Sequence, residues 1–306
     1  FSVNVNAGFE KTDGYDVTEK KDFDPSHKDA DNDGYENKNI GIHASLKTDI
    51  GNFTLISQHN RGSAQYDNAW GSDEGEFENY VNQVSWQKQS DQISHELNLS
   101  NTQDKNQQTG SVEGDNYQTD RSEAKYQLQY NANDELTWSG GVNWYEESVD
   151  KTHVGGNALN KTERDNFAIY AGGYYSGESF LFNATVRSDD YEQYGAENTY
   201  NLSLGYKASE NVTLRFTQGT AFRAPTFGNL YTPEGDWTRP NPDLQPEEGI
   251  NKELGALIQF DSGSVDIAIF DNNIDNMIAS SFADGKYTNV NIDEARMKGT
   301  EVTAKF

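Results

Sequence analysis

Acidic residues recur at every second position in the stretch 11–35, and this spacing is typical of a loop that binds a hard cation. Asp29, Asp31 and Asp33 alternate with other residues and are followed by Gly34. Carboxylate oxygens at alternate positions suit calcium, which takes six to eight oxygen ligands in flexible geometry. The pattern also matches the start of an EF-hand loop, in which a glycine makes the sharp turn.

A second acidic stretch offers the oxygens that would complete such a ligand shell. Ile40 at the twelfth position argues against an EF-hand, because a bidentate Glu is required there. Asp67 and the carbonyl of Tyr66, together with Asp73 or Glu76, could complete a calcium site instead. The alternative interpretation is that these acids are solvated loop charges, since the chain carries 50 acids against 24 bases.

The acidic stretches belong to a regular alternation of short polar turns and long connections. The short turns are predicted at 47–51, 88–91, 131–134, 176–179, 208–211 and 261–264. The long connections are predicted at 11–35, 61–76, 104–117, 148–162, 189–195, 221–249 and 272–294. Between them lie segments of roughly ten residues with two-residue alternation, which is the length of a tilted strand that crosses a bilayer. The alternation predicts an all-β, antiparallel, transmembrane β-barrel.

The individual segments read as strands. Phe1, Val3, Val5 and Phe9 alternate with small or polar residues, so one face can meet lipid and the other a wet interior. About fourteen such segments are expected, and no window has helical spacing over three turns, so almost no helix is expected. Aromatic residues lie close to the short turns, where an interfacial girdle belongs: Trp86, Tyr130, Trp138, Tyr174, Tyr175 and Tyr206.

Composition excludes several classes of protein. The net charge of −26 makes nucleic acid an unsuitable partner, because phosphate binding needs the opposite sign. With 33% hydrophobic residues, a mean hydropathy of −0.91 and no apolar run of about eighteen residues, a membrane-spanning helix is excluded. A barrel is not excluded, since only every second strand residue needs to face lipid. A soluble acidic β-protein is the alternative that composition leaves open.

Catalytic chemistry has little support. The five histidines are scattered without metal-ligand spacing, and no glycine-framed serine nucleophile occurs. The chain contains no cysteine. We therefore expect a protein that is not an enzyme.

Two proline-containing blocks in the centre of the chain are followed by a strand: Gly219, Thr220, Ala221, Phe222, Arg223, Ala224, Pro225, Asn229, Leu230 and Tyr231, then Asn241, Pro242, Asp243, Leu244, Gln245, Pro246, Glu247 and Glu253. This arrangement resembles the barrel motif of TonB-dependent outer-membrane receptors. A later stretch is similar to the family's next recurrent block: Tyr287, Asn289, Ala295, Lys298, Gly299, Glu301 and Val302. The resemblance implies that residues 1–306 form a partial β-barrel domain with about fourteen of 22 strands.

The N-terminal third is similar to the cobalamin receptors of that family. Residues 14–17 and 31–34, then Tyr66 and Asp67, match two calcium-carrying loops in order and approximate spacing. The resemblance implies calcium as the cofactor and a substrate contact at Asn68. The implied ligands are Asp16, Asp29, Asp31, Asp33, Tyr66, Asp67, Asp73 and Glu76, and the choice among the acids of 73–78 stays open.

The function implied by the resemblance is capture of cobalamin or a related corrinoid in the bacterial outer membrane, followed by uptake. TonB would drive uptake through an N-terminal plug domain, and the plug, the first strands and the last strands are expected to be absent from residues 1–306. An iron siderophore or heme receptor of the same fold is an alternative. A soluble calcium-dependent adhesin or carbohydrate-binding β-protein is an alternative of a different class.

Overall fold

The computed structural model describes the whole chain except residues 17–31, 69–71, 111–113, 153–158 and 160–162. The chain divides into two compact units. The first unit consists of Phe1–Lys88, Glu96–Ala124 and Tyr145–Arg164. The second unit consists of Gln89–His95, Lys125–Trp144 and Asp165–Phe306.

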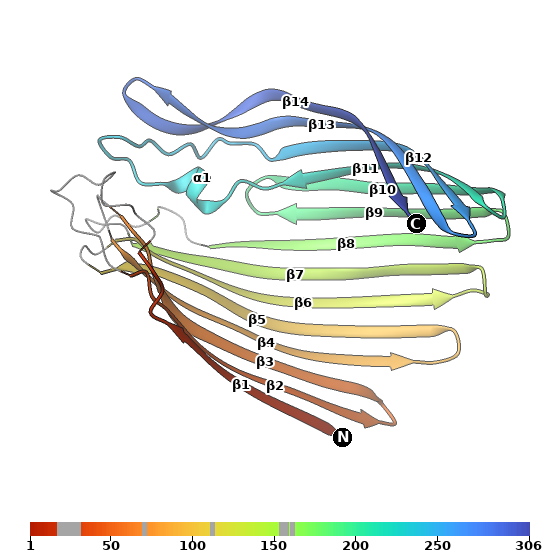
Figure 1. Ribbon diagram of the computed structural model, residues 1–306, viewed down its shortest axis with the longest axis horizontal. Coiled ribbons are helices and arrows are strands. Elements are labelled where there is room, and N and C mark those ends of the chain that lie inside the picture. Colours follow the sequence, from red (N-terminus) through yellow and green to blue (C-terminus); the bar gives the residue numbers. More distant parts are fainter. Residues whose placement is uncertain (17–31, 69–71, 111–113, 153–158, 160–162) are drawn as a thin grey trace. The chain divides into compact units, whose positions relative to one another are not determined.

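Fourteen strands and one short helix make up the regular structure of the described residues (Figure 1). The strands follow one another in chain order in one sheet, from β1 to β14. Their bounds are β1 Ser2–Thr12, β2 Tyr35–Thr48, β3 Gly51–Gln65, β4 Glu74–Gln89, β5 Ile93–Thr109, β6 Asn116–Asn131, β7 Leu136–Thr152, β8 Glu163–Ser176, β9 Phe180–Tyr191, β10 Gly195–Ser209, β11 Val212–Arg223, β12 Glu247–Phe260, β13 Gly263–Ala283 and β14 Lys286–Lys305. The helix is α1, Phe227–Tyr231.

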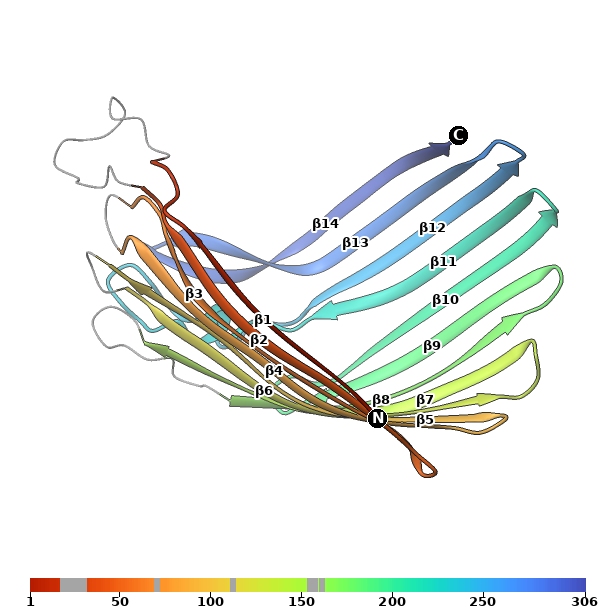
Figure 2. The same cartoon turned by 60° about the horizontal axis from the view of Figure 1, so that its bottom comes forward.

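The six predicted short turns are confirmed. Each predicted position falls between the end of an even-numbered strand and the start of the next strand. In the second unit, the turns that follow β8, β10 and β12 lie along one edge of the strands, as Figure 2 shows. The prediction of fourteen strands and almost no helix is also confirmed.

The long connection predicted at 272–294 is wrong. Strands β13 and β14 stay paired through this stretch, from Asp275 opposite Glu294 to Ala283 opposite Lys286. Only Asp284 and Gly285 separate the strands, and both have positive φ, 53° and 78°. An Asp-Gly pair with positive φ at both positions is a favoured two-residue hairpin turn. The polar composition of this stretch resembled a loop, but polar side chains do not interrupt a backbone ladder.

The connection predicted at 189–195 is also shorter than expected. Strand β9 continues to Tyr191 and β10 begins at Gly195, so three residues join the two strands. Most strands are longer than the ten or so residues that cross a bilayer. The loop-side ends of these strands therefore extend beyond the apolar band.

One face of the sheet exposes apolar side chains and the other is polar. In the second unit Leu254 is 60% exposed and its partner across β13, Ile269, is 56% exposed. On the opposite face, the Arg215 guanidinium donates hydrogen bonds to Glu253 Oε1 at 3.0 Å and to Asp266 Oδ1 at 2.7 Å. This division is the predicted one, with lipid on one side and a wet interior on the other. In the described part of the chain, no helix has the length and apolar character needed to span a bilayer.

Candidate functional site

The connections that carry the predicted calcium ligands lie beside one another in the first unit. The Asp33 backbone N–H donates to the Tyr15 carbonyl at 3.4 Å, which joins the two described ends of the first connection. The Gln65 N–H donates to the Gly34 carbonyl at 2.9 Å, and the Gly34 N–H donates to the Gln65 side-chain oxygen at 3.0 Å. The end of β3 is therefore attached to the residue that follows Asp33.

The next connection continues this series of contacts. The Tyr66 N–H donates to the Asp73 carbonyl at 2.9 Å, so the two ends of the connection between β3 and β4 are closed on each other. The Asp73 N–H donates to the Thr109 carbonyl at 3.2 Å, which ties this connection to the end of β5. Within it, the Asn68 amide donates to the Ser72 carbonyl at 2.9 Å. Asp33, Tyr66 and Asp73 therefore belong to one hydrogen-bonded group of chain ends.

Two glycines permit the close approach of these chain ends. Gly14 has a φ of +61°, and a Cβ there would lie 1.7 Å from the Asp33 carbonyl oxygen. Gly110 has a φ of +99°, and a Cβ there would lie 1.5 Å from Asp73 Oδ1. Any other residue would have to displace the acidic segment. Gly110 and Gln65 were not among the predicted site residues, and the only sequence signal for Gly110 is a glycine at the end of a strand.

The remaining predicted ligands are placed less uniformly. Asp16 and Asp67 lie in the same two connections, next to Tyr15 and Tyr66. Glu76 lies within β4 and pairs with Ser63 of β3, so its side chain belongs to the strand and not to the connection. Asp29 and Asp31 lie outside the described residues. Their part in the site stays a prediction.

The donors fit calcium in chemical type, since all of them are oxygens. Among the residues whose placement is described, no three acidic or histidine side chains gather closely enough to hold a metal ion.

A cavity of about 420 Å³ opens beside the first connection. Its lining includes Asn32 and Glu74, which lie in the two stretches whose sequence matches calcium-carrying loops, and Asp13 and Gln65, which sequence reasoning did not single out.

A second structured connection lies between β11 and β12. Thr226 caps α1: its hydroxyl accepts from the Asn229 N–H at 3.1 Å, and Asn229 Oδ1 accepts from the Thr226 N–H at 3.0 Å. Apolar residues of this connection are buried, with Phe227, Leu230 and Leu244 only 3%, 1% and 1% exposed. Burial of these side chains explains why a connection of this length has a defined structure.

Side chains of β14 hold this connection in place. Asn291 donates from its amide to the Gln245 carbonyl at 2.9 Å and accepts from the Gln245 N–H at 2.9 Å. The Asn241 amide donates to the Asn289 carbonyl at 2.8 Å, and the Asn289 amide donates to the Asn229 carbonyl at 3.2 Å. The residues that resembled the family motif in sequence are thus contacts that attach the connection to the strand.

A charged pair closes the base of the same connection. The Arg223 guanidinium donates to both oxygens of Glu247 at 2.6 Å and 2.5 Å, and Glu247 Oε1 also accepts from the Ile278 N–H at 2.7 Å. The Arg223 hydrogen bonds hold the pKa of Glu247 below its ordinary value, partly opposed by burial, with further lowering from the Ile278 N–H and from the charge of Arg223. Glu247 is therefore ionised where β12 begins.

Comparison with known proteins gives this architecture a family. The family profile described as "TonB dependent receptor-like, beta-barrel" matches residues 5–306. The "Vitamin B12 transporter BtuB" of Photobacterium profundum is 30% identical over 287 residues, which cover 90% of this chain and 46% of that protein. The protein of the same name from Vibrio cholerae serotype O1 (strain M66-2) is 29% identical over 314 residues, covering 99% of this chain and 49% of that protein. The chain spans about half the length of these relatives.

Solved structures show the same fold at lower identity. The ferric enterobactin receptor PfeA of Pseudomonas aeruginosa, as a double mutant, superposes with a TM-score of 0.79 at 17% identity, covering 98% of this chain and 54% of that one. The siderophore receptor PirA of the same organism gives 0.76 at 15% identity, covering 88% and 53%. The chain belongs to the β-barrel family of TonB-dependent receptors, which reside in the bacterial outer membrane.

Proposed function

We propose that this chain serves the uptake of a corrinoid, such as cobalamin, across the outer membrane. The similarity to proteins named vitamin B12 transporter, at 30% identity over 90% of the chain, is the observation that supports this most strongly. The siderophore receptors share the fold at 15–17% identity, and this likeness carries no argument about substrate. Membership of a receptor family replaces the alternative of a soluble adhesin and agrees with the expectation that the chain is not an enzyme.

The proposal includes TonB as the partner that drives uptake, acting through a plug domain expected outside residues 1–306. Substrate would be captured at the loop-side ends of the strands, where Asp33, Tyr66 and Asp73 lie on adjoining chain ends. Asn68, in the connection between β3 and β4, is the proposed substrate contact. No bond is made or broken in this function.

Calcium is proposed as the cofactor of these connections. The residues that would hold it are the predicted ligands that belong to these connections: Asp16, Asp29, Asp31, Asp33, Tyr66, Asp67 and Asp73. A bound cation would remove the mutual repulsion of these acids. Connections ordered before the substrate arrives would spare it the free energy of ordering them.

The test is a set of dissociation constants for cobalamin, a ferric siderophore and heme on the full receptor, measured with calcium and with a chelator. Of the three ligands, we expect only cobalamin to bind tightly. The chelator should raise the dissociation constant of cobalamin by roughly tenfold or more, which corresponds to a loss of about 1.4 kcal/mol in binding free energy. Tight binding of the siderophore or of heme, without binding of cobalamin, would refute the assignment of a corrinoid as the substrate. Equal cobalamin constants in the two conditions would remove calcium but leave the substrate assignment standing.

A matched pair of double variants distinguishes an effect of the acids in these connections on cobalamin affinity from an effect of the net charge of the chain. Asp33→Asn with Asp73→Asn should weaken cobalamin binding in calcium to the level found in chelator. Asp49→Asn with Asp91→Asn removes the same charge from short turns at the other ends of the strands, and should leave binding unchanged. An equal effect of both double variants would show that net charge, and not the connections, controls affinity.

A further inference from the structure

The apolar face of the first unit changes to a charged face within a few residues along the strands. The register of β2, β3 and β4 places side chains of this face in rows, starting from the short turn. The first four rows are Leu46, Phe53 and Trp86, then Ala44, Leu55 and Val84, then Ile42, Ser57 and Asn82, then Ile40, His59 and Tyr80. The next two rows are Lys38, Arg61 and Glu78, then Glu36, Ser63 and Glu76.

The charged rows lie at the level of lipid headgroups. Trp86 and Glu78 are eight positions apart in β4, which is about 27 Å along a strand and about 21 Å along the membrane normal at a tilt of 40°. The apolar band of an outer-membrane barrel is about 25 Å tall, with aromatic residues at each border. If Trp86 marks the turn-side border, the row of Lys38 and Arg61 lies about 21 Å from it and the row of Glu36 and Glu76, ten positions from Trp86, about 26 Å, so the two charged rows lie on either side of the loop-side border.

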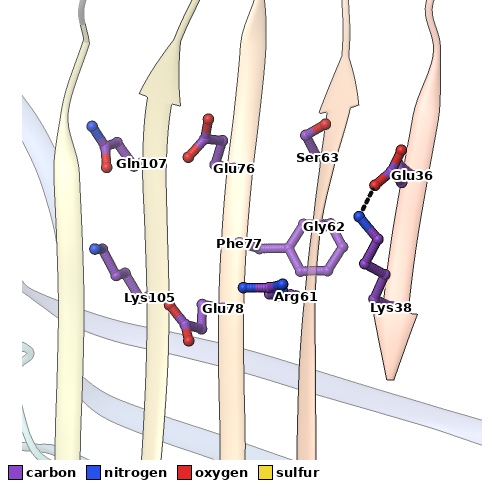
Figure 3. Close-up of a pocket in the computed structure, with 10 residues that line it drawn as sticks. All are labelled: Glu36, Lys38, Arg61, Gly62, Ser63, Glu76, Phe77, Glu78, Lys105 and Gln107. Carbon is purple, nitrogen blue, oxygen red and sulfur yellow. Dashed lines mark hydrogen bonds and ion pairs between the residues drawn. The ribbon is translucent and has the colours of Figure 1, made fainter. Parts of the chain in front are cut away.

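A cavity of about 370 Å³ opens in these rows (Figure 3). Figure 3 shows Lys105, Glu78, Arg61 and Lys38 side by side in one row. Lys105 comes from β5, the neighbour of β4 in the sheet. Cations that are scarce in a chain of net charge −26 therefore gather at one level of one face.

Two of these cations are free to bind an anion. Glu36 is held by Lys38 and by Lys11, whose Nζ lies 3.7 Å from Glu36 Oε2, and Glu78 Oε1 lies 2.9 Å from His59 Nε2. Within the part of the chain that the structure describes, neither Arg61 nor Lys105 makes a hydrogen bond or an ion pair. The carboxylates of the cavity thus have partners of their own, apart from Glu76, while these two donors do not.

We propose that this cavity binds a phosphate group on the headgroup of an outer-leaflet lipid, with Arg61 and Lys105 as the donors. The guanidinium fork of Arg61 suits two phosphate oxygens, and Lys105 adds a point charge from the next strand but one. Ile40, which is 51% exposed, lies in the row directly below, and Phe9, which is 63% exposed, pairs with Lys38 in the charged row itself, with its ring 5.7 Å from Lys38 Nζ. Acyl chains that contact these apolar residues would place the headgroup of their lipid at the cavity. A free phosphate ion has no acyl chains and would gain nothing from these residues.

The experiment measures binding of lipid A, a phosphorylated and acylated disaccharide, to the full receptor in detergent by native mass spectrometry. The same lipid without its phosphates and inorganic phosphate are the two comparison probes. We expect lipid A to bind, dephosphorylated lipid A to bind at least tenfold more weakly, and inorganic phosphate not to displace lipid A at millimolar concentration. Equal binding of the two lipids, or displacement by inorganic phosphate, would overturn the proposal.

Variants locate the site. Arg61→Gln with Lys105→Gln should weaken lipid A binding by roughly ten- to a hundredfold, because each lost charge-assisted contact removes about one tenfold step. Lys47→Gln with Lys88→Gln removes the same charge near the short turns and should leave binding unchanged. Arg61→Lys with Lys105→Arg keeps the charges and should retain most of it. If the Lys47 and Lys88 variant lost binding to the same extent, the cavity would not be the site. The comparison of lipid A with its dephosphorylated form uses the unaltered receptor, so it tests the proposal even where a variant fails to fold.

Discussion

Replacing Leu230 by Ala tests whether the connection between β11 and β12 is held by its own small core. The Leu230 side chain is 1% exposed, and Phe227 and Leu244 of the same connection are 3% and 1% exposed. Truncating a fully buried Leu to Ala costs about 3 kcal/mol, from lost transfer free energy and from the cavity left behind. Because all three buried residues belong to this connection, the cost should fall on the opening of the connection and not on the barrel as a whole.

Amide hydrogen exchange of the full receptor measures that opening. A loss of about 3 kcal/mol corresponds to a fall of about a hundredfold in protection at residues 227–245, with little change in β12 and β13. Leu254→Ala is the control, since Leu254 is 60% exposed on the apolar face and should leave protection of the connection unchanged. A fall of less than about threefold in the Leu230 variant would show that the Asn hydrogen bonds from β14, and not the apolar core, hold the connection.

Two further predictions concern the loop-side ends of the strands. Gly110→Ala should cost on the order of 1–3 kcal/mol in local stability and weaken cobalamin binding, because the new Cβ would meet Asp73. Gly285→Ala is the control: Gly285 has a φ of +78° and no atom within 4 Å of the added Cβ, so hydrogen exchange of this variant should show the cost of the positive φ alone. The lowered pKa of Glu247 means that its bond with Arg223 contributes stability above the ordinary value near 4.5, and that this contribution is lost as pH falls through the lowered pKa. Exchange protection of the connection should therefore decrease as the pH is lowered in the parent protein, and it should not change with pH in the Glu247→Gln variant. An identical pH profile in the two proteins would contradict the role given to the Arg223–Glu247 pair.

The strands and short turns could be predicted from the sequence because both depend on neighbouring residues. Alternation with a period of two decides which side chains share a face, and turn residues decide where a strand ends. The same local rules were available for Asp284 and Gly285, whose hairpin signal was outweighed by the polar composition around it. A prediction based on turn chemistry at that pair would have placed β13 and β14 correctly.

The site is a different matter, because its residues come together only through pairing between strands. Sequence alone identified Asp33, Tyr66 and Asp73 as oxygen donors and separated them into two connections. The register of β1 to β5 decides that these connections are adjacent, and Gly110 was invisible as a site residue until Asp73 was placed against it. The sequence by itself determined the period, the faces and the chemistry of each connection.

Tertiary structure alone decided which distant positions share a level on a face. Arg61 and Lys105 lie on β3 and β5, and nothing in their spacing along the chain relates them. They meet because each strand is aligned with its neighbour by a ladder of backbone hydrogen bonds, and a shift of one residue would send every side chain to the other face. Local pattern determines the strand, whereas register, a long-range property, determines the site.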